Sequence, residues 1–223
     1  MSTSKSSMRP GDKRLRKKGA TYHHGDLRRS LLAAALKLLA HEGPTGVTLR
    51  GVAKMTGVSQ AAPYRHFASR EALLAAVATE AFQGLSEAMA DGAKAAGDSP
   101  IEQFQGMGVA YVGYAARDPF RFRLMFGTDV GRKTDYPELE QAARQSFKQL
   151  LDGVVTCQQA GAIRQGATEA LALLAWASVH GLAELVIDKQ VASATGRVEP
   201  AEALAQELTD HLYLGLASSP AGL

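Results

Sequence analysis

Residues 48–67, with the sequence TLRGVAKMTGVSQAAPYRHF, constrain the fold of this chain more than any other segment. Thr48 and Ser59 are suited to cap helices, because a side-chain oxygen can accept a hydrogen bond from an unpaired backbone N–H. Gly57 lies between them, where a tight turn favours a residue that tolerates positive φ. Ala53 is small enough to let two helices cross closely. The pattern predicts a helix-turn-helix with helices over 48–55 and 59–66, a motif that places its second helix in the major groove. The alternative is a helical pair that only packs on a core.

The end of this segment resembles the DNA-binding domain of the TetR (tetracycline-repressor-like) family of bacterial regulators. In that family a Tyr-x-His-Phe run closes the recognition helix, and a basic–acidic pair opens the next helix. The resemblance covers about residues 24–75 and rests on Tyr64, Arg65, His66, Phe67, Arg70, Glu71, Leu73 and Leu74. It implies a three-helix DNA-binding head followed by a helical body.

Pro63 departs from the family pattern, which has a leucine or a similar residue before the tyrosine. With Ser59 as the cap, proline would be the fourth helical residue. It lacks the N–H of the first intrahelical hydrogen bond, and it disfavours the helical conformation of Ala62. We therefore expect a distorted first turn in a recognition helix that otherwise remains intact.

Charge is divided unevenly along the chain. Residues 1–70 carry 14 of the 25 Lys and Arg but 3 of the 22 Asp and Glu, so their net charge is +11, while residues 71–223 carry −8. This division fits a DNA-binding head on a body that avoids DNA. Residues 1–21 are predicted to form a disordered basic arm, which is either a solvated tail or a segment that lies along phosphates or in a minor groove.

The predicted DNA contacts divide into two kinds. Gln60 and Ala61, at the start of the second helix, would meet base edges, because glutamine suits adenine and the alanine methyl suits a thymine methyl. The matching family positions imply that the phosphates are held by Thr48, Tyr64, His66 and Arg70. The predicted surface is completed by Ser59, Arg50 and Arg65.

The remaining composition favours an all-α protein. Hydrophobic residues make up 46% of the 223 residues, only 8 are proline, and no convincing alternating run predicts a strand. We expect about nine helices, in a helix-turn-helix domain over 22–68 and a ligand-binding and dimerisation domain over 69–223. Besides the helix-turn-helix pair, the expected helices cover 24–41, 69–90, 100–116, 118–126, 137–160, 168–189 and 201–217. Gly43 and Pro44 would end the first of them, Thr168 would cap the eighth, and Gly92, Gly97 and Pro100 would mark a loop.

Several classes of function are disfavoured by the sequence. It has no glycine-rich phosphate loop, HExxH motif or nucleophile elbow, and no Cys/His cluster with zinc spacing, so we expect neither an enzyme nor a cofactor or metal. The single Cys157 is either a buried, inert thiol or a redox sensor. Ser178, His180 and Glu184 interrupt the apolar segment 170–187, which favours a core or interface helix over a membrane span. A signal-peptide pattern is absent, so we expect a cytoplasmic protein.

The body carries the candidate ligand site. Phe104, Met107 and Tyr111 share one helical face, which is typical of a core. The family resemblance implies instead that this bundle holds an effector pocket, to which Met125 and Phe126 would also belong. Trp176, His180 and Gly181 resemble the C-terminal domain named WHG in one branch of the family, and residues 22–28 resemble the same branch. His180 is either a core histidine or a pocket residue.

The last two expected helices each have an apolar face. We predict a dimer built as a four-helix bundle through Leu171, Leu174, Leu182, Leu204, Leu208 and Leu212. Two heads about 34 Å apart, or a multiple of that distance, would then read a palindrome in double-stranded DNA. The prediction is a ligand-responsive transcriptional regulator, with preference for a repressor that is released from its operator by a small molecule. The alternative is an all-helical ligand-binding protein that does not bind an operator.

Overall fold

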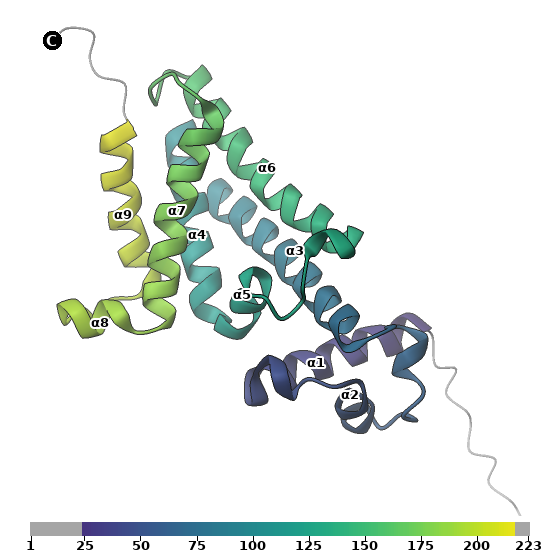
Figure 1. Cartoon of the computed structure of the whole chain (residues 1–223). Coiled ribbons are helices and arrows are strands. Elements are labelled where there is room, and N and C mark those ends of the chain that lie inside the picture. Colours follow the sequence, from purple (N-terminus) through teal and green to yellow (C-terminus); the bar gives the residue numbers. More distant parts are fainter. Residues whose placement is uncertain (1–23, 217–223) are drawn as a thin grey trace, which may run out of the picture.

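The computed structural model describes residues 24–216, and within that range the chain forms nine α-helices and two short 3₁₀ turns without a strand (Figure 1). The predicted basic arm lies outside the described residues. The first two helices form a small head, and the remaining helices form the body. The elements are α1 (His24–Gly46), α2 (Leu49–Thr56), η1 (Pro63–Arg65), α3 (Arg70–Ala96), α4 (Pro100–Arg117), α5 (Pro119–Phe126), η2 (Lys133–Asp135), α6 (Pro137–Gln159), α7 (Thr168–Ile187), α8 (Gln190–Thr195) and α9 (Ala201–Leu216).

Helix α3 joins the head to the body and runs diagonally through Figure 1. It begins as predicted, because the N–H of Ala72 donates to the Ser69 hydroxyl at 3.1 Å. It does not end near residue 90, however, and Gly92 lies inside the helix. A Cβ at Gly92 would lie 2.7 Å from the carbonyl oxygen of Gly106 on α4. The glycine is therefore a close-packing site between two helices and not a loop residue.

The body packs α3, α4, α6, α7 and α9 around one apolar core, which continues into the head. Helix α4 contacts α3, α5, α6, α7 and α9, and α3 packs against both α4 and α6. The head meets the body in two places, since α1 contacts both α3 and α5. Helix α5 also packs on α3 and α4. Both α3 and α5 are therefore positioned to carry a displacement from the body to the head.

Local signals predicted most helix ends correctly. Asp118 caps α5 by accepting from the N–H of Arg121, and α1 is broken at Gly43, whose φ is 70°. Thr168 does not cap α7, because its hydroxyl donates to the Gln158 side chain at 2.9 Å. The short helix α8 was not predicted. The count of nine helices matches the expectation only because α8 takes the place of the expected second helix of the helix-turn-helix.

Cys157 of α6 lies in a second, smaller cluster of apolar side chains, to which α7 and α9 also contribute. It is fully buried, and its Sγ donates to the backbone carbonyl of Pro100 at 3.3 Å. Burial in this apolar setting raises the pKa of the thiol to about 11. The structure thus favours the inert thiol over the redox sensor.

This burial predicts slow reaction of the Cys157 thiol with disulfide reagents in the native protein. At about pH 8, a thiol with a pKa of about 11 is ionised in roughly one molecule in a thousand, and the thiolate is the reactive form. Ellman's reagent should therefore leave Cys157 unmodified in the folded protein and titrate one thiol per chain after denaturation in guanidinium chloride. Rapid release of the chromophore from native protein would instead identify an accessible, activated thiol.

Candidate nucleic-acid interface and ligand cavity

The first half of the helix-turn-helix forms as the sequence predicts. Thr48 caps α2, because its hydroxyl accepts from the N–H of Gly51 at 2.9 Å. Gly57 ends the helix with φ 70° and ψ 24°, the left-handed conformation for which glycine is suited. The N–H of Val58 donates to the carbonyl of Ala53 at 3.1 Å and closes the turn. Ala53 is fully buried, which agrees with a close crossing at this point.

The second half differs from the expectation. No α-helix begins at Ser59, and the segment 59–67 is a series of turns that includes the 3₁₀ turn η1. Pro63 has no N–H to donate to the Ser59 carbonyl, which accepts from Ala62 instead at 3.0 Å. His66 likewise donates three residues back, to Pro63. Ala62 itself keeps helical φ and ψ, so the missing donor, and not a distorted preceding residue, accounts for the change. The prediction of an otherwise intact helix was wrong.

The predicted base-contacting side chains still lie on the surface of the head. Gln60 and Ala61 are exposed, and Tyr64 is 53% exposed, which is unusual for a large aromatic side chain. Arg65 is exposed beside Tyr64 on η1, which packs against α2. The other predicted contacts from these two elements are Thr48, Arg50 and Ser59, which are exposed, and His66, which is half-buried. The segment therefore presents polar side chains to solvent although it is not a regular helix.

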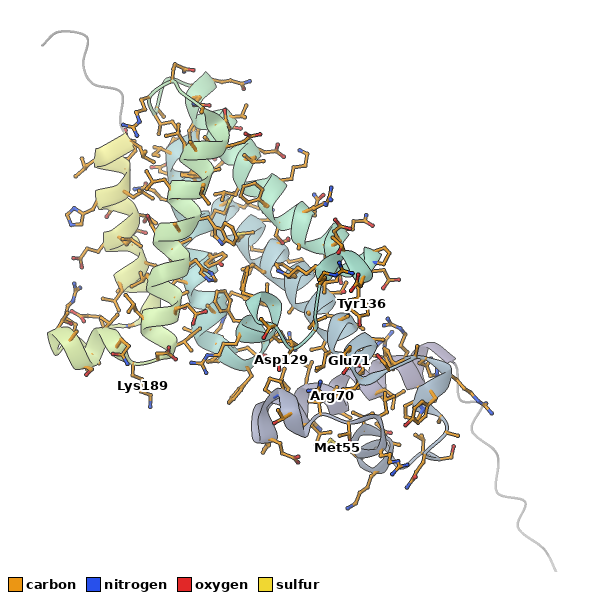
Figure 2. All side chains as sticks on the ribbon, in the orientation of Figure 1. Met55, Arg70, Glu71, Asp129, Tyr136 and Lys189 are labelled. Atoms are coloured by element: carbon orange, nitrogen blue, oxygen red, sulfur yellow. The ribbon has the colours of Figure 1, made fainter. Side chains whose placement is uncertain are left out.

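The guanidinium of Arg70 bonds to the loop before α2. Its Nε donates to the carbonyl of Val47 at 3.0 Å, and a terminal nitrogen donates to the carbonyl of Pro44 at 2.5 Å. A third contact, at 3.5 Å, reaches the carboxylate of Glu71. Figure 2 shows Arg70 and Glu71 where α3 leaves the head that carries Met55. The guanidinium thus holds the loop before α2, a role that the sequence did not predict, while a direct phosphate contact by Arg70 stays a prediction.

Arg28 is a head residue that sequence reasoning missed. Its guanidinium carbon lies 5.3 Å from the centre of the Phe67 ring, a cation–π arrangement that ties α1 to the end of the 59–67 segment. Phe67 is only 3% exposed. A spacing of nearly forty residues gives no local signal for this pair. The contact anchors the last residue of the turn segment to the core of the head.

The body encloses a cavity of about 250 Å³ between α3, α4, α6, α7 and α9. Its wall is mainly apolar, which is typical of small-molecule sites. Five of the predicted ligand residues line it, namely Phe104, Met107, Tyr111, Phe126 and Trp176. Two predictions need correction. Met125 is fully buried on another face of α5, and His180 lies behind the wall and not on it. No cluster of three or more metal-binding side chains occurs among residues 24–216.

A chain of hydrogen bonds supports one side of the cavity. The indole N–H of Trp176 donates to the hydroxyl of Tyr111 at 3.1 Å, and that hydroxyl lies 2.8 Å from Nδ1 of His180. The hydroxyl can accept from the indole and also either donate to or accept from Nδ1, so the tautomer of His180 sets the direction of the second bond. Burial lowers the pKa of His180, which favours the neutral imidazole and is opposed by the nearby carboxylate of Glu184. Burial also raises the pKa of Tyr111, so its hydroxyl remains protonated. His180 is therefore a half-buried residue behind the cavity wall that holds the pocket residue Tyr111 in place.

Lys133 also lines the cavity and was not predicted. It lies in η2, between α5 and α6, in a segment that the sequence marks only as a polar loop. Its Nζ is 4.9 Å from the ring centre of Phe82 and 5.2 Å from that of Phe126. The charged neighbours Arg132 and Asp135 form an exposed ion pair, so nothing in the local sequence distinguishes Lys133 from an ordinary surface lysine.

Most of the predicted dimer residues point into the protomer and not away from it. Leu171 and Leu204 are buried inside the protomer, Leu212 lines the cavity, and Leu182 and Leu208 are half-buried against the core. Leu174, at 44% exposure, is the one that faces outward. The sequence could not resolve this because α7 has apolar side chains on its inward and its outward face, and contacts with α4, α6 and α9 determine which face is inward.

An exposed apolar face of α7 remains, and we call it the α7 stripe. By length and composition α7 is the one described helix that could cross a membrane. In the structure it is a body helix with one side packed inward, and α9 lies next to it (Figure 1). Leu173 and Leu185 are 55% and 49% exposed. The stripe consists of Ala170, Leu173, Leu174, Ala177, Gly181 and Leu185.

Comparison with known proteins agrees with the helix-turn-helix head and the helical body. Residues 31–77 match the family described as bacterial regulatory proteins of the tetR family, and residues 104–212 match the tetracyclin repressor-like C-terminal domain. The chain belongs to the TetR family. It is therefore a transcriptional regulator with a DNA-binding head and a ligand-binding body.

Solved structures share the TetR fold along nearly the whole chain. A Rhodococcus sp. RHA1 protein of unknown function is 32% identical, with a TM-score of 0.79 over 90% of this chain and 100% of the other. PfmR, a TetR family regulator from Thermus thermophilus, is 19% identical, with a TM-score of 0.60 over 84% and 99% of the two chains. A TetR family regulator from Marinobacter aquaeolei is 19% identical, with a TM-score of 0.65 over 86% and 95%. No curated protein matches.

Proposed function

We propose that this TetR family regulator is a repressor that binds a palindromic operator as a homodimer and is released when a small molecule enters the body cavity. The observation that carries the proposal is the position of α5. Phe126 of this helix lines the cavity, while α5 as a whole contacts α1 of the head. A ligand that displaces Phe126 therefore acts on an element that touches the DNA-binding domain.

Helix α3 supplies a second connection between the two sites. Phe82 and Leu85 of α3 line the cavity, and Arg70 at its other end holds the loop before α2. Phe126 and Phe82 also stack edge to face at a centroid distance of 5.5 Å, so α3 and α5 move in contact with each other. Coupling is reciprocal, so a ligand that weakens operator binding must itself bind less tightly to the DNA-bound protein.

The α7 stripe is the proposed dimer interface. The exposed leucines form a contiguous apolar patch, and such patches usually mark an interaction surface. A two-fold axis would pair the same stripe on both copies. Gly181 on the stripe has open space where a Cβ would be, which lets a partner helix approach closely. Dimerisation would place two heads on successive half-sites, and one short segment could not read enough base pairs alone.

The proposed DNA contacts follow from exposure. Gln60 and Ala61 would meet base edges, while Tyr64, Arg65 and Arg50 would contact phosphates. Thr48, Ser59 and His66 would contribute from the edge of the same surface. Arg70 would act through the loop that it holds. Phosphate contacts of this kind make binding sensitive to salt.

A gel shift with the promoter beside the protein's own gene tests the proposal. The wild type should give a sequence-selective shift that weakens as salt rises. Tyr64→Ala should lower affinity for promoter and random DNA alike, by about fivefold, whereas Gln60→Ala should lower it only for the promoter, because base contacts carry the specificity. Equal losses for both variants on both DNAs would refute the division of roles.

One observation favours a second candidate function. The 59–67 segment lacks the regular recognition helix, which fits an all-helical ligand-binding protein without an operator. The charge of the head and its exposed Tyr64 and Arg65 argue against it. Absence of any salt-sensitive, selective shift on the promoter would favour this alternative over the repressor.

A further inference from the structure

The cavity wall contains one charged side chain among the described residues that line it, and that side chain is Lys133. Four other polar side chains on the wall already have partners inside the protein, while Tyr213 adds a further hydroxyl to the lining. Tyr111 bonds to Trp176 and His180, and Ser146 bonds to Ser86. Gln105 and Thr209 are engaged by Asp210 and by a backbone carbonyl of α9, respectively. The ammonium group of Lys133 is thus the charged group on the wall with which an anionic ligand could form an ion pair.

The position of Lys133 disfavours the protonated, charged form of its side chain. Burial lowers its pKa, and no carboxylate of residues 24–216 forms an ion pair with it. The faces of Phe82 and Phe126 offset part of the desolvation, because aromatic rings attract a cation, but they accept none of its N–H donors well. Lys133 is half-buried, and an ammonium group that is partly withdrawn from water without a carboxylate partner is stabilised by pairing with an anion.

We propose that the effector of this cavity is an apolar molecule with a single anionic group, such as a carboxylate, whose charge lies on Nζ of Lys133. The apolar remainder would lie among the aromatic and aliphatic side chains of α3, α4, α6 and α7. The inference rests on the proposed function of the cavity as the effector site. A dianion would leave its second charge unpaired in an apolar wall, and a cationic ligand would be repelled.

The position of Lys133 also gives the anion a route to the head. Its Nζ lies over the ring of Phe126, which belongs to α5, and over that of Phe82, which belongs to α3. Pairing with an anion would draw the ammonium group away from these two faces. The two helices that connect the body with the head are therefore the two whose aromatic side chains respond to the charge.

Trp176 provides the readout for a test. It is the single tryptophan of the chain and lines the cavity, so its fluorescence reports occupancy without a label. The full-length protein is titrated with octanoate, 1-octanol and octylamine, which share one chain and differ in head group. Octanoate should bind about tenfold more tightly than 1-octanol, since a charge-assisted hydrogen bond contributes free energy of that order. Octylamine should bind most weakly.

Variants at Lys133 separate the charge from the shape of the wall. Lys133→Met should weaken octanoate binding about tenfold and leave 1-octanol within about twofold, while Lys133→Arg should retain the preference for the anion. Arg132→Met is the matched control, because it removes a cation from the same loop whose side chain is 83% exposed. It should change neither affinity.

The outcomes distinguish the inference from the function on which it rests. Equal affinity for octanoate and 1-octanol, or an unchanged octanoate affinity in Lys133→Met, would overturn the anionic class while leaving the cavity as an apolar ligand site. Failure of all three probes to change the Trp176 signal would overturn both the anionic class and the cavity as an effector site. Loss of 1-octanol binding together with octanoate in Lys133→Met would show that the substitution deforms the wall, and Lys133→Arg then decides the role of the charge.

Discussion

Replacing Arg70 with methionine is expected to lower the free energy of unfolding by about 2–3 kcal/mol and to weaken operator binding more than tenfold. The guanidinium donates to the carbonyls of Val47 and Pro44, and hydrogen bonds from a charged donor contribute about 1.5–3 kcal/mol each, less where solvent reaches them. The side chain is 29% exposed, which favours the lower end for each bond. The loop that it holds leads directly into Thr48, the cap of α2. Binding should weaken because the helix-turn-helix loses its fixed position on α3.

Arg65→Met is the matched control for this prediction. Arg65 is an exposed arginine on η1, close in sequence to Arg70 but with its side chain turned to solvent and not to the loop before α2. Its loss should weaken DNA binding and reduce the salt dependence of binding, while the urea midpoint stays nearly unchanged. If Arg70→Met instead keeps wild-type stability and loses only salt-dependent affinity, Arg70 contacts phosphate directly and the loop-holding role is wrong.

Leu185→Glu is expected to convert the dimer into monomers. Leu185 is 49% exposed on the α7 stripe, and a carboxylate there would be buried next to its symmetry mate, where desolvation and like-charge repulsion both oppose association. Light scattering coupled to size-exclusion chromatography should give the mass of one chain. Operator affinity should fall by about a hundredfold or more, because two linked heads bind with a high effective concentration and separate heads do not.

A charge elsewhere on the body provides the comparison. Val155 on α6 is 37% exposed and lies outside the α7 stripe. Val155→Glu should therefore keep the mass of the dimer and the operator affinity. A dimer that survives Leu185→Glu would place the interface on another face, and monomers from both variants would indicate general destabilisation of the body.

Local chemistry in the sequence was sufficient for most of the fold. Thr48, Ser69 and Asp118 each cap the helix that was expected, because a capping bond involves atoms only a few residues apart. Gly57 ends α2 for an equally local reason. The family resemblance then supplied the order of head and body, which matched families confirm.

Roles that depend on distant partners were the ones that the sequence did not predict. Arg70 reads as a basic residue beside DNA, yet its partners lie 23 and 26 residues earlier in the chain. Gly92 reads as a loop residue until Gly106 of α4 packs against it. Lys133 reads as a surface lysine until Phe82 and Phe126 are placed beneath it. Amphipathic periodicity also failed for α7, because a helix with apolar side chains on two opposite faces does not show in its sequence which of them is packed inward.

The effect of Pro63 was underestimated for a different reason. One missing N–H was expected to disturb only a first turn, but the segment is so short that no later turns exist to restore the α-helical pattern. Ser59 thereby loses its predicted function as a cap. The missing N–H of Pro63 was correctly expected to disturb the helix, but the size of its effect was underestimated.

The 59–67 segment is fixed at its two ends and, between them, by the buried Pro63. Val58 bonds back to Ala53 at one end, and Phe67 is buried beneath Arg28 at the other, while the residues between them are joined by a few short-range turns. Any conformational freedom that the free protein keeps in these turns is entropy of the residues that would meet base edges. DNA must remove that entropy when it binds, and the cost reduces affinity without altering any contact. The strength of operator binding in this regulator is thus set partly by preorganisation of a segment in the absence of DNA.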